Sequence, residues 1–124
     1  MNYFIVTQTD GVIQITSFAQ RLTSRWPQTH LEEISNPASS HALEFRIPMT
    51  HSRVDGSINR AGSALVFIGD LRDCAELALW CRSTLPAHEP LTLCDEGMSG
   101  SIELEQETTL AEIYAAFRYQ PPRS

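Results

Sequence analysis

Apolar and polar residues alternate most regularly between His41 and Met49, in the segment HALEFRIPM. Leu43 and Phe45 fall on one side of this segment, whereas Glu44 and Arg46 fall on the other. Because successive side chains of a strand point to opposite faces, this pattern predicts a strand with one buried face. The proline near its end indicates an edge or a strand terminus.

Other segments have shorter strand patterns, separated by turn signals such as Asp10-Gly11. The predicted strands are residues 2–7, 12–15, 31–34, 53–59, 64–68, 91–94 and 101–105. The segment ALVFI at 64–68 is apolar throughout, which predicts a central strand covered on both faces.

The strongest helical pattern covers Asp70–Leu85, with Asp70 at the N-cap position. Its apolar stripe consists of Leu71, Cys74, Ala75, Ala78, Cys81 and Leu85. Arg72, Glu76 and Arg82 lie off this stripe, and the spacing of Arg72 and Glu76 predicts a pair one helical turn apart.

Two further helices are expected. The first begins at Thr16 or Ser17 as its cap and ends before Pro27. The last begins at Thr108 or Thr109, and Thr109 with Glu112 fits a capping box. The aromatic residues on the apolar stripes and strands are expected to pack in the core: Phe18, Trp26, Phe45, Phe67 and Trp80.

These elements predict one α+β domain over residues 1–120 and a frayed tail over 121–124. Without the two weakest strands, 12–15 and 31–34, the order is β-α-β-β-β-α-β-β-α. Neighbouring strands punctuated by helices favour an antiparallel-rich sheet packed by about three helices.

Composition fits a folded cytoplasmic protein. The 124 residues are 42% hydrophobic and 19% charged, which argues against disorder. No apolar run reaches the ~20 residues that span a bilayer, and the start lacks the features of a signal peptide. The three cysteines, an odd number at no metal-ligand spacing, are expected to be buried free thiols.

Charge is unevenly distributed along the chain. The net charge is −6, and all nine basic residues are arginines. This balance argues against a nucleic-acid partner and permits a basic protein partner. Residues 1–82 hold eight acids and seven arginines, whereas residues 83–117 hold seven acids and no arginine.

The acidic third therefore supplies the candidate binding residues. They are the carboxylates Asp95, Glu96, Glu103, Glu105 and Glu107, with Met98 as an apolar anchor. A simpler interpretation is a solvated sheet face that keeps the protein soluble. A metal site is disfavoured because the oxygen-ligand spacing of an EF-hand is missing, and no cofactor is expected.

Catalysis has little support in the sequence. There is no nucleophile-elbow, phosphate-loop, dinucleotide or zinc-protease motif. The alternative of a small enzyme would rest on His51, Asp55 and the Asp95–Glu96 pair around a cleft. A third alternative is a homo-oligomeric adaptor that associates through an apolar patch or an edge strand. The sequence leaves the oligomeric state open.

Four segments carry a resemblance to a known group of proteins: FRIPM, DGSINR, GDLRDCAELALWCRSTLP and LTLCDEGMSGSIELEQETT. Over residues 43–112 the chain resembles immunity proteins encoded beside bacterial polymorphic or contact-dependent growth-inhibition toxins. The resemblance implies a cytoplasmic protein that binds one cognate toxin domain, often a nuclease, and blocks it without doing chemistry. It identifies no contact residue.

Overall fold

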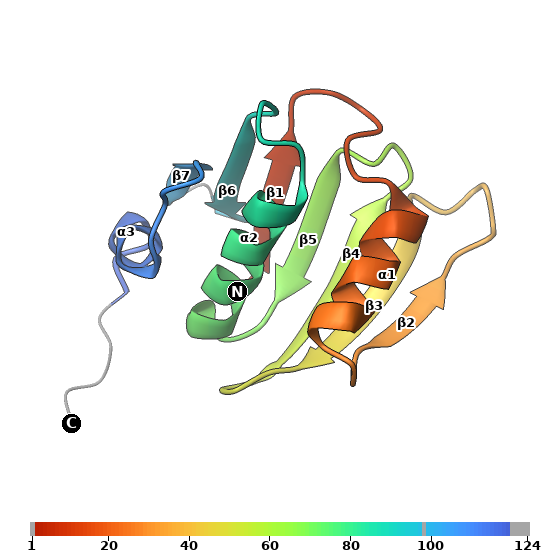
Figure 1. The fold of residues 1–124 in the computed structure, drawn as a ribbon, viewed down its shortest axis with the longest axis horizontal. Coiled ribbons are helices and arrows are strands. Elements are labelled where there is room, and N and C mark those ends of the chain that lie inside the picture. Colours follow the sequence, from red (N-terminus) through yellow and green to blue (C-terminus); the bar gives the residue numbers. More distant parts are fainter. Residues whose placement is uncertain (1, 98, 120–124) are drawn as a thin grey trace.

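The computed structural model describes residues 2–97 and 99–119. They form one seven-stranded sheet and three helices (Figure 1). The strands are β1 Asn2–Thr7, β2 His30–Glu33, β3 His41–Pro48, β4 Arg53–Asn59, β5 Ala64–Ile68, β6 Leu91–Asp95 and β7 Ser101–Leu104. The helices are α1 Ile15–Arg25, α2 Leu71–Thr84 and α3 Leu110–Ala116. The predicted tail at 121–124 lies outside the described residues.

The sheet is antiparallel at every pairing, in the order β2-β3-β4-β5-β1-β6-β7. Chain neighbours pair along β2 to β5, as expected for short connections. The N-terminal β1 is placed between β5 and β6, where Phe4 lies opposite both Val66 and Cys94. The predicted α+β class with an antiparallel sheet is confirmed, and the weak strand at 31–34 is present as β2.

The helices α1 and α2 cross the same face of the sheet (Figure 1). The core lies between them and the sheet and contains the fully buried Ile5, Phe67 and Leu77. Phe18, Phe45 and Phe67 are buried as predicted, while Trp26 and Trp80 are half-buried beside the core. Helix α3 packs on this side too, where Phe117 meets Tyr3 edge to face at 5.5 Å.

The start of α1 differs from the prediction. Residues 12–14 form no strand, and the helix begins at Ile15 with Gln14 at its N-cap. Thr16 and Ser17 lie inside the helix, so neither is the cap. The Gln14 side chain makes no capping bond. The apolar residues at 12–15 resemble a strand in the sequence. Ile13 is indeed buried, but its backbone amide donates a hydrogen bond to the Gly62 carbonyl within a loop.

The caps of α2 and α3 are confirmed. The Asp70 carboxylate accepts a bond from the Arg72 amide, and Thr109 and Glu112 form the complete capping box. The predicted Arg72–Glu76 pair is wrong. Arg72 instead pairs with Asp70 at 2.8 Å, because a carboxylate at the N-cap lies within reach of the first turn.

The prediction that β5 is covered on both faces is wrong. Leu65 and Phe67 are buried beneath the helices, but Ile68 is 47% exposed and Val66 is half-buried. No helix of the described residues covers the sheet face opposite α1 and α2. We call this surface the open face.

Candidate binding surface at the β6–β7 edge

Arg82 fixes the segment that carries the acidic residues. From the last turn of α2 its guanidinium donates to the carbonyls of Glu89 at 2.8 Å and Leu104 at 3.2 Å, and also to the carbonyl of Pro86. The residue is 4% exposed. The sequence placed it off the apolar stripe of α2, and in the structure it binds the 86–90 loop and β7 to the helix.

Glu89 holds the same loop from the other side. It is buried, and one carboxylate oxygen accepts bonds from the backbone amides of Gln8 at 3.0 Å and Thr9 at 2.9 Å. These amides follow β1, so the loop is attached to both the central strand and α2. A carboxylate that accepts backbone amides satisfies its own burial.

Asp95 is not part of an exposed acidic surface. It is 3% exposed and lies opposite Tyr3 on the helix-covered face. Its carboxylate accepts bonds from the Ser99 hydroxyl at 2.6 Å and the Ser99 amide at 2.8 Å. The hydroxyl bond and then the amide bond lower the pKa of Asp95. This carboxylate therefore orders the β6–β7 turn.

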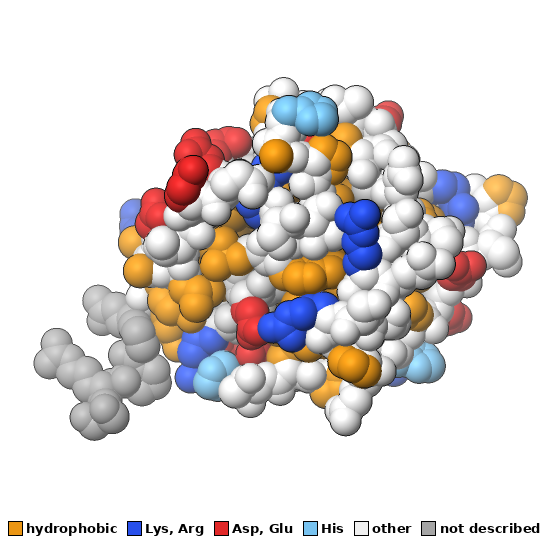
Figure 2. Space-filling model, in the orientation of Figure 1, with side chains coloured by type: hydrophobic (Ala, Val, Ile, Leu, Met, Phe, Trp, Pro, Cys, Tyr) orange, Lys and Arg blue, Asp and Glu red, His pale blue; other side chains and the backbone are white. Residues whose placement is uncertain are grey.

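The other predicted carboxylates are exposed. Glu96 follows β6, Glu103 lies on β7, and Glu105 and Glu107 follow β7. Acidic side chains gather at the upper left of the molecule, over β7 (Figure 2). None of the four forms an ion pair with another described residue. We call these four glutamates the acidic edge; the predicted anchor Met98 lies outside the described residues.

A shallow hollow adjoins the acidic edge. It is about 370 Å³ in volume, and Arg82 with residues 87–90 and 103–107 forms its walls. Glu103 is held at this site by an accepted bond from the Thr92 hydroxyl at 2.7 Å. The hollow brings together Glu103, Glu105 and Glu107, whose carboxylates suit a cationic side chain of a partner better than an anion.

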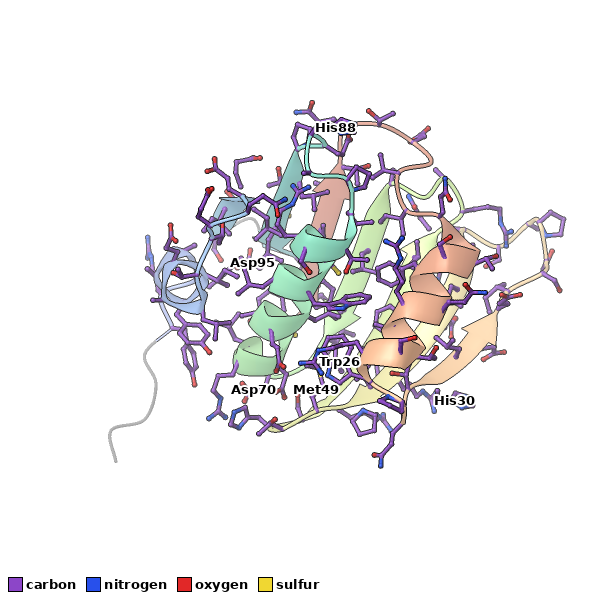
Figure 3. All side chains as sticks on the ribbon, viewed as in Figure 1. Trp26, His30, Met49, Asp70, His88 and Asp95 are labelled. Atoms are coloured by element: carbon purple, nitrogen blue, oxygen red, sulfur yellow. The ribbon has the colours of Figure 1, made fainter. Side chains whose placement is uncertain are left out.

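The residues proposed for an enzyme do not converge. Asp55 lies opposite Ile68 on the open face, whereas Asp95 lies opposite Tyr3 on the helix-covered face. Two strands, β5 and β1, separate them in the sheet. In Figure 3, His30 marks the β2 edge of the sheet and Asp95 lies toward the β7 edge. The predicted cleft of His51, Asp55 and Asp95–Glu96 is therefore not formed.

The three cysteines are buried free thiols, as the sequence predicted. Burial raises the pKa of Cys74 to about 12 and raises the pKa of Cys81 further. Burial, with a smaller contribution from Asp95, also raises the pKa of Cys94. A thiol is nucleophilic only as a thiolate, so none of the three is activated.

Two further observations bound the site. No cluster of three or more His, Cys, Asp or Glu side chains that could hold a metal ion occurs among the described residues. Within the same residues, no helix has the length and apolar composition needed to cross a lipid bilayer.

A scan against protein-family models, a search of curated proteins and a search of solved structures each found no match.

Sequence reasoning missed Arg82 and Glu89. A signal was present, because an arginine in the last turn of a helix can bind carbonyls left free at the helix end. Arg82 precedes Pro86 by four residues, so the loop after the proline folds back onto it.

Proposed function

We propose that this protein is an immunity protein, which binds a cognate bacterial toxin domain in the cytoplasm and blocks it. The observation that supports this most directly is the acidic edge, with its four exposed glutamates that lack ion pairs among the described residues. The resemblance over residues 43–112 supports a toxin as the partner. A nuclease domain is the toxin class that we favour.

The charge of the acidic edge suits such a partner. Nuclease active sites are basic because they hold phosphate groups, so the carboxylates of Glu103, Glu105 and Glu107 beside the hollow can occupy the same site. Crowded carboxylates repel one another, and a cationic partner relieves that repulsion. Complementary charge also accelerates encounter, with association rates that fall as salt is added.

Rigid placement of the edge favours tight binding. Arg82 and Glu89 hold the hollow on two sides, and Thr92 orients Glu103. A surface ordered before binding loses less conformational entropy when the partner arrives, so more of the interaction energy contributes to affinity.

The test uses the protein encoded by the neighbouring gene as the partner. The purified pair is expected to form a one-to-one complex in which the partner's activity is blocked. The double variant Glu103→Lys/Glu105→Lys is expected to weaken binding at least ~100-fold and to flatten the salt dependence of the association rate.

A matched control separates the site from net charge. The variant Glu32→Lys/Glu33→Lys makes the same charge change at two exposed residues of β2, at the opposite edge of the sheet from β7. This control variant is expected to bind the partner within about threefold of the wild-type affinity. Charges far from an interface act mainly through weak long-range steering. Equal weakening by both variants would refute the acidic edge as the binding site, and absence of any complex would refute the proposed function.

A further inference from the structure

The open face of the sheet has an apolar centre. Val6 is 37% exposed and Ile68 is 47% exposed, and both lie on the two central strands β1 and β5. Phe4 and Val66 lie between them on the same face, directly opposite each other. An apolar patch at the middle of an otherwise polar surface is typical of an interaction site.

Charged side chains lie beside this centre in two rows that cross the strands. In the first row, His30 of β2 lies opposite Arg46 of β3. In the second row, Glu32 lies opposite Glu44. Directly opposed like charges destabilise a sheet, and neither glutamate forms an ion pair with a described residue, nor does Arg46.

The registers extend both rows through the sheet. The first row continues from Arg46 through Asp55 to Ile68. The second continues from Glu44 through Ser57 to Val66 and then Phe4. On β3 the two rows carry opposite charges, and on β5 both are apolar; on β1 the first row reaches the polar Asn2 and the second reaches Phe4.

We propose that the open face binds a second copy of this chain, as a symmetric face-to-face dimer. A two-fold axis that crosses the strands between the two rows places the first row of one copy over the second row of the other. Arg46 then faces Glu44 of the second copy, and Ile68 faces Val66. The same rotation brings His30 to Glu32, so the opposed glutamates gain a guanidinium on β3 and an imidazole on β2. A two-fold interface must be self-complementary in this way.

Packing geometry agrees with this arrangement. Two sheets pack about 10 Å apart with their strands within about 30° of each other, so neighbouring rows can stay matched near the axis. The short edge strands β2 and β7 carry glutamates, which discourage association edge to edge. The face is therefore the better-suited surface for a second copy.

The area is sufficient for a modest dimer. Seven strands spaced about 4.8 Å apart and about five residues deep give a face of roughly 500 Å² per copy. Two copies bury about 1,000 Å², which is at the lower limit for a specific interface. We therefore expect a weak, reversible dimer. The acidic edge meets this surface at Glu103, which lies opposite Thr92 and so shares the open face with Val6, whereas Glu105 and Glu107 follow β7 and lie outside both rows.

Sedimentation velocity between about 1 µM and 500 µM tests the dimer. Wild-type protein is expected to shift from monomer to dimer across this range. Ile68→Lys, which changes an exposed side chain, is expected to raise the dissociation constant at least ~10-fold. Circular dichroism confirms that the variant keeps its fold. A wild-type protein that stays monomeric to 500 µM would overturn the proposal. The same result would be seen if the toxin, and not a second copy, covered the open face.

A charge exchange supplies the specific test. Arg46→Glu alone and Glu44→Arg alone each place like charges across the two-fold axis, so each is expected to weaken the dimer. The double variant restores the opposed pair and is expected to recover most of the affinity. Failure of the double variant to recover would overturn the proposed register. The acidic-edge variant Glu105→Lys/Glu107→Lys changes only residues that follow β7, so it is expected to weaken toxin binding and to dimerise as wild type, and the two proposals can fail separately.

Discussion

Arg82 offers the sharpest test of how the fold supports its acidic edge. Replacement by Met keeps a side chain of similar length and removes the guanidinium. The carbonyls of Pro86, Glu89 and Leu104 then lose their donor inside the protein. Buried polar groups left without partners are costly, because water that bound them in the unfolded chain cannot reach them.

The magnitude follows from these bonds. A hydrogen bond to a charged group contributes about 1.5–3 kcal/mol, and each buried acceptor left without its donor costs about 1–3 kcal/mol. We therefore expect Arg82→Met to lower the free energy of unfolding by about 3–5 kcal/mol. Arg82→Lys should recover only part of this, since an ammonium is compact and cannot reproduce the fork of the guanidinium.

The assay is urea unfolding followed by tryptophan fluorescence, with hydrogen exchange of the β7 amides as a local measure. Exchange in β7 should accelerate more than exchange in β3, which four intervening strands separate from β7 in the sheet. Arg72→Met is the control, because Arg72 lies at the other end of α2 and its ion pair is partly exposed. A loss below about 1 kcal/mol for Arg82→Met would refute the argument that these carbonyls depend on Arg82.

Three further predictions follow from single contacts. Gly56→Ala would bring a Cβ to 2.3 Å from the ring of Phe45 and 2.7 Å from the Val66 carbonyl, so we expect a loss of about 1–3 kcal/mol in urea unfolding; unchanged stability would contradict this close packing. The bond from Arg72 lowers the pKa of Asp70 to about 2, so stability from this carboxylate is present above its unfolded pKa near 4 and is lost as pH falls toward 2. Asp70→Asn keeps a good cap and should flatten that acid decline, by about 1 kcal/mol after solvent screening; an equally steep decline would contradict the assignment. The buried thiols should react with a thiol reagent at pH 8 only after unfolding, and rapid labelling of the native protein would contradict their raised pKa values.

Much of the secondary structure was determined by local sequence. Alternation along 41–48 defines β3, and the capping pattern of Thr109 and Glu112 defines the start of α3. These signals are reliable because a strand or helix places neighbouring residues in fixed directions, whatever the rest of the fold does. Prediction failed at residues 12–14. Their apolar side chains resemble those of a strand, but the Ile13 amide bonds a carbonyl of a distant loop.

Only the tertiary structure decided which charges are exposed. Asp95 and Glu96 are neighbours in the sequence, yet Asp95 is buried beneath the helices and Glu96 is exposed. Arg82 lies off the apolar stripe of α2, yet it is buried because the 86–90 loop folds over it. Such outcomes depend on contacts between residues far apart in the chain, and composition carries no record of those contacts.

Strand order was likewise decided by the fold as a whole. The sequence contains β1 and β5 as separate apolar strands, but their pairing across about sixty residues creates the apolar centre of the open face. The same registers align His30 with Arg46 and Glu32 with Glu44. A register is set by burial of one face of every strand at once, so these rows exist only in the assembled sheet.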